Sequence, residues 1–233
     1  MIVSIVIPVF NEANTIQKIL KKINKITKIK KDIIVVDDGS TDGTKDIIKY
    51  KCKNLYNTFL SLNKNRGKGF ACRAGLKKIK GDIVIIQDAD LEYDPNDYDK
   101  LIKPILKNQT NIVYGSRVLK GGKRTRPKTF DVLIRLSANH FLTFLSNMLN
   151  RHSLTDAHTC YKVFKKSVYK KIKLEEDGFN FCPEITAKFS KLGEKIYEVP
   201  INYFGRTHGE GKKISFFDGF RAIYAIIKYN IFR

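Results

Sequence analysis

The sequence is poor in cysteine and has no long apolar run. Its four cysteines form no CxxC pair and show no zinc-ligand spacing, so we expect free thiols in a reducing compartment. No stretch of about 18 apolar residues occurs, and the apolar run at the N-terminus is shorter than a signal-peptide core. The sequence therefore predicts no transmembrane helix and a protein that is soluble or lies on a membrane.

Acidic residues are scarce as well. The 23 Asp and Glu residues stand against 44 Lys and Arg, which gives a formal net charge of +21. This excess favours polyanionic partners, namely nucleic acid, nucleotide phosphates or an acidic membrane surface. A basic nucleic-acid-binding module is the alternative from another functional class, but the sequence contains no RNP-like block or helix-turn-helix signature. Nucleic acid would also give no role to the acidic motif described below, so we expect no nucleic-acid partner.

Short β-rich runs alternate along the chain with segments of helical spacing. The expected strands cover residues 2–8, 33–36, a run from about 56, 83–86 and 111–117. Between the first two runs, apolar residues recur at Ile16, Ile19, Leu20 and Ile23, as in an amphipathic helix. Continuous apolar strands separated by helices predict an α/β fold, with a mostly parallel sheet covered on both faces. Ligands then bind beyond the carboxyl ends of the strands.

The segment GDIVIIQDADLEYDP, residues 81–95, passes directly from a buried strand into four carboxylates. Asp94 is well placed to cap the helix expected after it. Capping does not account for Asp88 and Asp90, which precede that helix by several residues. Neighbouring carboxylates repel one another unless a cation lies among them, and they are hard ligands suited to Mg²⁺ or Mn²⁺. The motif predicts a metal site at Asp88, Asp90 and Glu92, with the metal carrying a phosphate group.

Ordered blocks along the chain carry a resemblance to a known family. The blocks are VSIVIPVFNE, IIVVDDGSTDGT, NRGKGFACRAG, DIVIIQDADLEYDP, VYGSR, TDAHTCYKVFKK and EVPINYFGRTHGEGKKI. In order and form they resemble family-2 nucleotide-sugar glycosyltransferases of the Rossmann-like GT-A fold. They are most similar to the dolichol-phosphate and polyprenol-phosphate sugar transferases. The match spans nearly the whole chain, from Val3 to about Ile214.

The resemblance implies an inverting glycosyltransferase that moves a hexose from a GDP- or UDP-linked donor to a polyprenyl phosphate. It places the reaction at the cytoplasmic membrane face and implies Mg²⁺ or Mn²⁺ as the cofactor that bridges the donor diphosphate. By matched position, the implied nucleotide-binding residues are Pro8, Phe10, Glu12, Asp37, Gly67, Lys68 and Asp88. The implied catalytic residues are Asp90, Arg117, Asp156 and Glu184.

Plainer interpretations stay open for several of these positions. Gly67 and Gly69 allow close backbone approach to a nucleotide, but they are also typical of a simple turn. Asp37 and Asp38 could both be turn formers, and this is the role we expect for Asp38. Arg117 could be a structural ion-pair partner. The four histidines show no metal-ligand pattern, and no chemistry is assigned to them.

The acceptor decides whether the reaction needs a base. A lipid phosphate is largely ionised at neutral pH and needs none. A sugar hydroxyl on a growing glycan is the alternative acceptor, and it would need Asp156 or Glu184 as a general base. Cys160 stands where many relatives of the family have Gly or Ser, which puts the acceptor pocket in question.

A glycine-rich basic segment near the C-terminus is the expected acceptor-phosphate site. Arg206, Lys212 and Lys213 lie close enough in the sequence to converge on one phosphate, and aromatic residues follow at once to contact a prenyl chain. We expect the basic, amphipathic residues 211–233 to lie at an anionic membrane surface. Some members of the family continue here into transmembrane helices, so peripheral attachment and a membrane-protein partner are both open.

The chain is expected to divide into two halves of one domain and a C-terminal segment. Residues 1–115 form the nucleotide-sugar-binding half, residues 116–210 the acceptor-binding half, and residues 211–233 the amphipathic segment. Residues 130–149 carry a broad apolar stripe. Most such stripes belong to the core, whereas in prenol-phosphate transferases the matching region lies near the membrane, so core and interface are both open for this helix.

Overall fold

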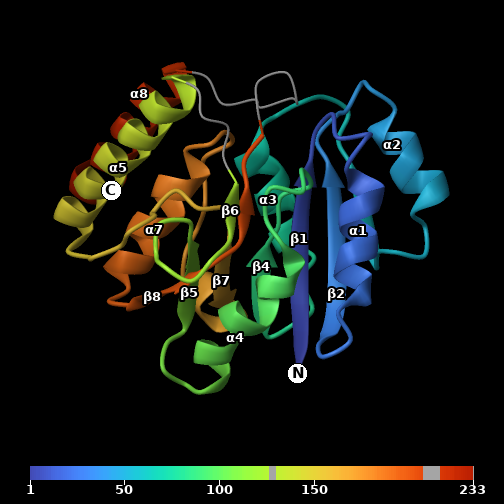
Figure 1. Ribbon diagram of the computed structural model, residues 1–233, viewed down its shortest axis with the longest axis horizontal. Coiled ribbons are helices and arrows are strands. Elements are labelled where there is room, and N and C mark those ends of the chain that lie inside the picture. Colours follow the sequence, from blue (N-terminus) through green and yellow to red (C-terminus); the bar gives the residue numbers. More distant parts are fainter. Residues whose placement is uncertain (126–129, 207–215, 233) are drawn as a thin grey trace.

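A computed structural model describes residues 1–125, 130–206 and 216–232 (Figure 1). In these ranges the strands are β1 (Ile2–Val9), β2 (Lys30–Asp37), β3 (Thr58–Ser61), β4 (Ile83–Ile86), β5 (Ile112–Ser116), β6 (Arg124–Thr125), β7 (Lys162–Lys165), β8 (Ile196–Pro200) and β9 (Tyr203–Phe204). The helices are α1 (Ile16–Lys25), α2 (Thr44–Asp46), η1 (Ile47–Lys51), α3 (Lys68–Leu76), η2 (Pro95–Asp97), α4 (Tyr98–Leu106), α5 (Phe130–Asn150), α6 (Lys166–Tyr169), α7 (Phe181–Lys191), α8 (Phe216–Ile227) and η4 (Lys228–Phe232).

Seven strands form one sheet in the order β3-β2-β1-β4-β7-β5-β8, and β6 pairs with β9 in a second, two-stranded sheet. β1 lies between β2 and β4 and is parallel to both, so that Ile5 is opposite Ile33 and Ile85. All three side chains are buried. The carboxyl ends of these parallel strands meet at one edge of the sheet, and the polar segments that follow them meet there too.

β7 is the exception, because it runs antiparallel between β4 and β5. The sequence pattern did not predict this strand, since lysine is atypical of a buried strand. Lys162 is nevertheless buried. Its ammonium group donates to the carbonyl oxygens of Ala157 and Thr159, at 2.9 Å each, and lies 4.0 Å from the centre of the Tyr114 ring.

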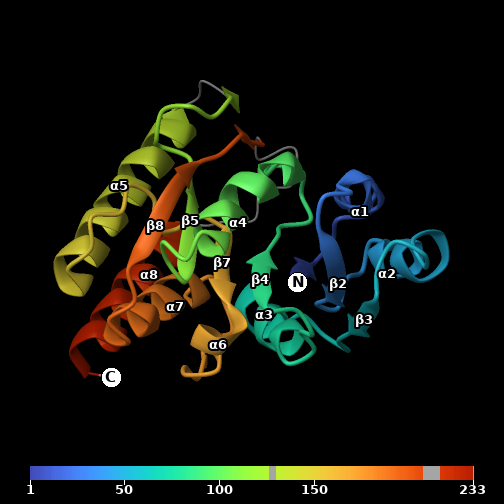
Figure 2. The ribbon, with the colours of Figure 1, turned by 90° about the horizontal axis from the view of Figure 1, so that it is seen from below.

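Helices cover the large sheet on both faces (Figure 2). α1 and α4 lie on one side, and α3, α6 and α7 lie on the other. One continuous core of buried apolar residues runs through the sheet, from Val3 to Tyr203. The expected α/β fold with a mostly parallel, doubly covered sheet is therefore confirmed. The strands before and after residue 115 belong to the same sheet, and the division into two functional halves stays a prediction.

The helices α5 and α8 lie side by side at one end of the molecule (Figure 1). Leu142 of α5 packs against Ala222 and Ile226 of α8, whose other side contacts α7 through Ala225. α5 therefore has one core-facing side, whereas several of its large apolar side chains are exposed. These are Leu133, Ile134, Phe141, Phe144 and Met148, which we call the outer face. In the described part of the chain, no helix is both long enough and apolar enough to span a bilayer.

Candidate active site

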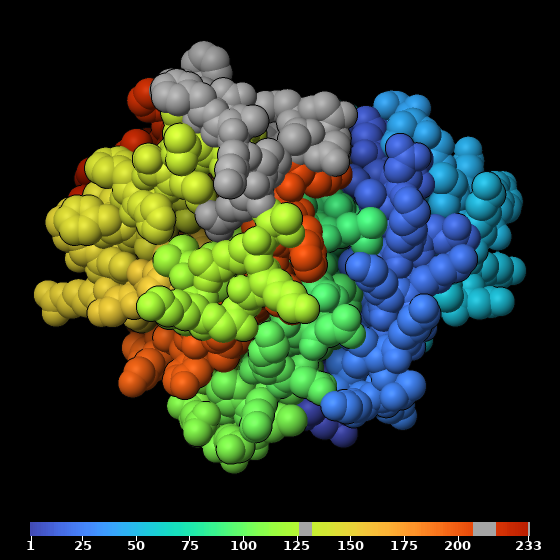
Figure 3. Space-filling view, viewed as in Figure 1, coloured from blue at the N-terminus to red at the C-terminus, as the bar shows by residue number. Residues whose placement is uncertain are grey.

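A cavity of about 940 Å³ opens beyond the carboxyl ends of β1, β4 and β5. Figure 3 shows the molecule from the side of the sheet, with the blue N-terminal segments and yellow α5 at opposite ends and green and orange segments between them. The lining includes the sequence-predicted residues Pro8, Phe10, Glu12, Gly67, Lys68, Asp88, Asp90, Glu92, Arg117, Asp156 and Arg206. It does not include Asp37 or Glu184. The fold thus brings most of the predicted site together.

The two aspartates of the acidic motif are each held by a protein cation. The Lys68 ammonium lies 2.6 Å from an Asp88 oxygen, and the Arg206 guanidinium lies 2.9 Å from an Asp90 oxygen. Lys68 is the first residue of α3, whereas Arg206 follows β9 near the other end of the chain. Burial, together with the charges of neighbouring Asp88 and Glu92, raises the pKa of Asp90 to about 7 against the opposing effect of Arg206.

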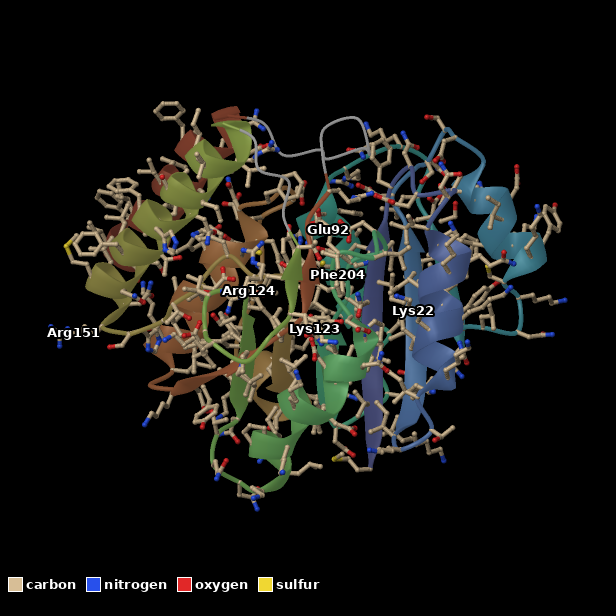
Figure 4. The ribbon with its side chains drawn as sticks, viewed as in Figure 1. Lys22, Glu92, Lys123, Arg124, Arg151 and Phe204 are labelled. Atoms are coloured by element: carbon tan, nitrogen blue, oxygen red, sulfur yellow. The ribbon has the colours of Figure 1, made fainter. Side chains whose placement is uncertain are left out.

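Glu92, the expected third metal ligand, is buried, and its hydrogen bonds hold the segment from Tyr203 to Arg206 in place. One of its carboxylate oxygens accepts a hydrogen bond from the Tyr203 hydroxyl at 2.9 Å, and the other accepts one from the backbone N–H of Arg206 at 2.8 Å. Its backbone oxygen also accepts from the N–H of Phe204 at 2.8 Å, and both residues are labelled in Figure 4. These bonds tie the acidic motif to β9.

Arg206 lies among the acidic residues that are expected to bind the nucleotide sugar and its metal ion. Its guanidinium bonds both carboxylate oxygens of Glu12, at 3.2 Å each, in addition to Asp90. These contacts differ from the acceptor-phosphate role expected for Arg206. Lys212 and Lys213, the other expected acceptor residues, lie outside the described residues. We call the set Glu12, Lys68, Asp88, Asp90 and Arg206 the donor wall of the cavity.

The carboxylates on the cavity determine whether the expected Mg²⁺ or Mn²⁺ fits this site. Within residues 1–125, 130–206 and 216–232, no three His, Cys, Asp or Glu side chains converge as a ready-made metal cage. Mg²⁺ rarely uses such a cage, because it is usually held by one or two carboxylates together with substrate phosphates and water. Asp88 and Asp90, both on the cavity, therefore fit a cation whose coordination is completed by a diphosphate.

Arg117 and Asp156 form an ion pair on another part of the lining, and its carboxylate is fully buried. The Arg117 side chain donates to both Asp156 oxygens, at 2.7 and 2.9 Å, and its backbone N–H donates to one of them at 3.0 Å. Burial alone would raise the pKa of Asp156, but the Arg117 charge and hydrogen bonds outweigh it and lower that pKa to about 2. Asp156 is thus a weak base that orients Arg117.

Glu184, the other candidate base, lies away from the cavity. It is fully buried in α7 and accepts hydrogen bonds from the backbone N–H groups of Glu175 and Glu176 at 2.7 and 2.9 Å. Its carboxylate also pairs with Lys188 one helical turn further on, at 2.6 Å. The contacts give Glu184 a structural role and give no support to its use as a base.

Two adjacent aspartates lie in different surroundings. Asp37 is fully buried and accepts from the N–H of Ser40 within the turn after β2. Asp38 lines the cavity, and its carboxylate accepts from the N–H groups of Arg66 and Gly67 at 2.9 and 2.7 Å. Asp38 therefore positions the loop that precedes α3, a function that its sequence context of turn residues concealed.

The glycines of that loop approach another part of the protein. Gly67 has a φ of +100°, a left-handed conformation that favours glycine. A Cβ atom on Gly69 would lie 2.3 Å from the carbonyl oxygen of Glu176. The close approach predicted for Gly69 is thus made to the segment around residue 177, while Gly67 also lines the cavity.

Several cavity residues were missed by the sequence analysis. His158 lines the cavity, and burial, with the nearby cations, lowers its pKa to about 4, so that the ring is neutral at pH 7. The Arg117 guanidinium lies 6.0 Å from the centre of the Tyr93 ring and 5.3 Å from that of Tyr203. Arg135 also lines the cavity, from α5. No spacing in the sequence distinguishes these residues from ordinary core or surface positions.

Comparison with known proteins gives consistent matches. Residues 4–173 match the sequence model of the family described as glycosyl transferase family 2. The chain is 29% identical over 233 residues to the dolichol-phosphate mannosyltransferase of Pyrococcus furiosus, with 99% of this chain and 65% of that protein covered. It is 32% identical over 229 residues to a dolichyl-phosphate beta-glucosyltransferase of Trichomonas vaginalis, with 91% and 68% covered.

The fold is similar to that of glucosyl-3-phosphoglycerate synthase from Mycobacterium tuberculosis, crystallised with Mn²⁺, UDP and glucosyl-3-phosphoglycerate. The TM-score is 0.71 at 20% sequence identity, and the match covers 98% of this chain and 79% of the other. At this identity the likeness supports the fold alone.

Proposed function

Because the chain belongs to glycosyl transferase family 2, and so is an enzyme of the glycosyltransferase class, we propose that it transfers a sugar from a nucleotide-diphosphate sugar to a polyprenyl phosphate. The observation that carries this proposal is a single cavity with two unlike sides. Its donor wall is ionic, whereas the side formed by α5 and α8 is largely apolar and continues into the exposed outer face. A charged donor and a lipid acceptor need these two environments.

The donor diphosphate binds at the donor wall. Pro8 and Phe10 line the end of the cavity at which the nucleoside is expected, and the N–H groups of residues 66 and 67 are fixed there by Asp38. Lys68 and Arg206 supply positive charge for the diphosphate. A Mg²⁺ or Mn²⁺ ion held by Asp88 and Asp90 would neutralise charge that develops on the leaving nucleoside diphosphate. The donor is a GDP- or UDP-linked sugar.

The acceptor is a phosphate and reacts without a protein base. An oxygen of the ionised phosphate attacks the anomeric carbon from the face opposite the leaving group, and the nucleoside diphosphate departs with the electrons of the broken C–O bond, so the configuration inverts. The alternative acceptor, a glycan hydroxyl, would need a base. Asp156 has a pKa near 2 and is bound to Arg117, and Glu184 lies away from the cavity, which favours the phosphate.

The acceptor phosphate binds on the α5 side of the cavity. Arg135 projects from the helix that carries the outer face and lines the cavity, as does Arg117. Val132, Leu136 and Ile223 line the same side with apolar surface, which suits the first units of a prenyl chain. This assignment moves the acceptor phosphate from Arg206 to Arg135.

The outer face contacts an anionic membrane leaflet. Ile134, Phe141 and Phe220 line the cavity and are also exposed, so the apolar surface of the cavity is continuous with that of the outer face. A lipid chain bound in the cavity could therefore enter the bilayer without crossing water. The net charge of +21 complements an anionic surface, and the cytoplasmic leaflet is the usual site of anionic lipids.

The experiment is a transfer assay with defined acceptors. The purified protein is incubated with Mn²⁺, a panel of UDP- and GDP-sugars and vesicles that contain polyprenyl phosphate, and the lipids are analysed by mass spectrometry. We expect one sugar to be added to the phosphate and no product with free polyprenol. Transfer to a soluble glycan with none to polyprenyl phosphate would instead establish the hydroxyl acceptor. The Asp90→Asn variant controls for contaminating activity.

A further inference from the structure

We propose that Lys68 and Arg206 act as exchangeable counter-ions of Asp88 and Asp90: a divalent cation displaces them from the carboxylates, and they then bind the donor diphosphate. The inference rests on the proposed function in one respect, because it requires a diphosphate donor. It assigns to these two side chains a coupling between cation binding and donor binding.

The first observation is that each carboxylate of the motif has its own protein cation. Lys68 bonds Asp88 at 2.6 Å and Arg206 bonds Asp90 at 2.9 Å. Each of these bonds occupies one oxygen of a carboxylate that an incoming metal ion would coordinate. A divalent ion and a protein cation on the same carboxylate repel each other, so metal coordination weakens or breaks both ion pairs.

The second observation is that the carboxylates of these two pairs are accessible, unlike the carboxylate of the other ion pair of the cavity. Side-chain exposure is 20% for Asp88 and 16% for Asp90. Asp156, in contrast, has an exposed fraction of 0% in its pair with Arg117. A hydrated ion can therefore reach Asp88 and Asp90 from the cavity, whereas the Asp156 carboxylate is sealed.

The third observation concerns the freedom of Arg206 to move. Its backbone N–H is fixed to Glu92, so the residue stays at the cavity while its long side chain changes partner. The guanidinium also bonds Glu12, which can retain it when Asp90 is taken by the cation. Lys68 has a flexible four-carbon side chain at the start of α3, next to the N–H groups fixed by Asp38.

These contacts predict positive coupling between the two ligands. A cation that binds alone separates the Lys68–Asp88 and Arg206–Asp90 ion pairs, which costs free energy. When a nucleoside diphosphate is present, its phosphate oxygens become the new partners of Lys68 and Arg206. Each ligand therefore strengthens the binding of the other, and the coupling is reciprocal.

The test measures binding rather than turnover. Calorimetry determines the affinity for Mn²⁺ alone, and for UDP and GDP at saturating Mn²⁺, in wild type, Lys68→Met, Arg206→Met and the control Lys28→Met. Lys28 forms an exposed pair with Asp99 on α4, so its variant removes the same charge away from the cavity. We expect Mn²⁺ alone to bind roughly tenfold tighter to the first two variants, about 1.4 kcal/mol each. We expect the nucleotide to bind roughly tenfold weaker to them, with the control unchanged in both respects.

The Lys68→Met and Arg206→Met variants should bind Mn²⁺ more tightly and the nucleotide more weakly. These opposite changes in affinity distinguish the exchange from its alternatives. If Mn²⁺ alone binds both variants no more tightly than wild type, the exchange is wrong, even when the nucleotide is weakened. If wild type binds neither nucleotide better in Mn²⁺ than in EDTA, the metal-dependent donor site of the proposed function fails instead. The Arg206→Lys variant keeps the charge, and intermediate Mn²⁺ affinity in this variant supports the exchange if Arg206→Met does not fold.

Discussion

The two sides of the cavity are held in different ways. The polar side, which includes the donor wall and the Arg117–Asp156 pair, is built from charged side chains that bond one another across long sequence separations. The α5 side is built from two helices that pack through a few apolar residues and leave others exposed. Substitutions on the polar side should therefore alter the stability of the fold, whereas substitutions on the outer face should alter only what the protein binds.

The largest effect on stability is expected for the Arg117–Asp156 ion pair. Arg117→Ala leaves the buried carboxylate of Asp156 without its cation, and breaking a buried pair from one side costs about 3 to 5 kcal/mol. Chemical denaturation measures the free energy of unfolding. The matched control is Lys28→Ala, whose exposed pair with Asp99 is worth about 0 to 1 kcal/mol. Equal losses in the two variants would show that the polar side is no more constrained than the surface.

The same pair gives stability a defined pH dependence. The pKa of Asp156 is lowered from 3.8 to about 2 in the folded protein, so its contribution is present above pH 4 and is lost as the pH falls toward 2. The shift corresponds to about 2.5 kcal/mol, of which about half should be lost by pH 3. The difference in unfolding free energy between wild type and Asp156→Asn should shrink accordingly between pH 6 and pH 3. A difference that stays constant with pH contradicts this assignment.

A smaller loss of stability is expected where the start of α3, next to the donor wall, packs against the segment around residue 177. Gly69→Ala places a methyl group 2.3 Å from the Glu176 carbonyl oxygen and 2.9 Å from that of Gly178, and such overpacking costs about 1 to 3 kcal/mol. Gly178→Ala is the control, because a Cβ atom there meets nothing within 4 Å. Thermal and chemical unfolding of both variants measure the effect. If Gly69→Ala is as stable as its control, the close approach does not constrain the loop.

The smallest effect on stability is expected on the outer face. Phe144 and Met148 are 65% and 59% exposed, so replacing both with Ser should change the unfolding free energy by less than about 0.5 kcal/mol. Binding to anionic vesicles should fall at least roughly tenfold, because each large apolar side chain contributes about 1.5 to 3 kcal/mol when buried. Leu106→Ser, at an exposed position of α4, is the control. If the Phe144→Ser, Met148→Ser variant sediments with vesicles as fully as wild type, the outer face has no role in membrane binding.

Part of the site follows from the sequence because it depends on local pattern. Apolar runs such as Ile33–Val36 and Ile83–Ile86 predicted buried parallel strands, and the polar residues that end them could be assigned to one edge of the sheet. Asp88 and Asp90 were placed at the cavity in this way. β7 escaped prediction because its buried Lys162 is satisfied by carbonyl groups and a ring that the strand pattern does not reveal.

The role of each charged residue depended instead on its partner. Asp37 and Asp38 are adjacent and chemically identical, yet only Asp38 reaches the loop at Arg66 and Gly67. Glu184 was a plausible base until its oxygens were seen to bond the backbone of residues 175 and 176.

The sequence by itself determined the α/β architecture, the family and the motif carboxylates, because these are encoded by short-range periodicity and by residues close together in the chain. Only the tertiary structure decided that Arg206 belongs to the donor wall and that Arg135 shares the cavity with an exposed apolar helix. Arg206 and Glu12 are 194 positions apart. The interaction energy of a charged side chain, and hence its role, depends on its distance from other charges and on its exclusion from water. Both are set only once distant segments have packed together.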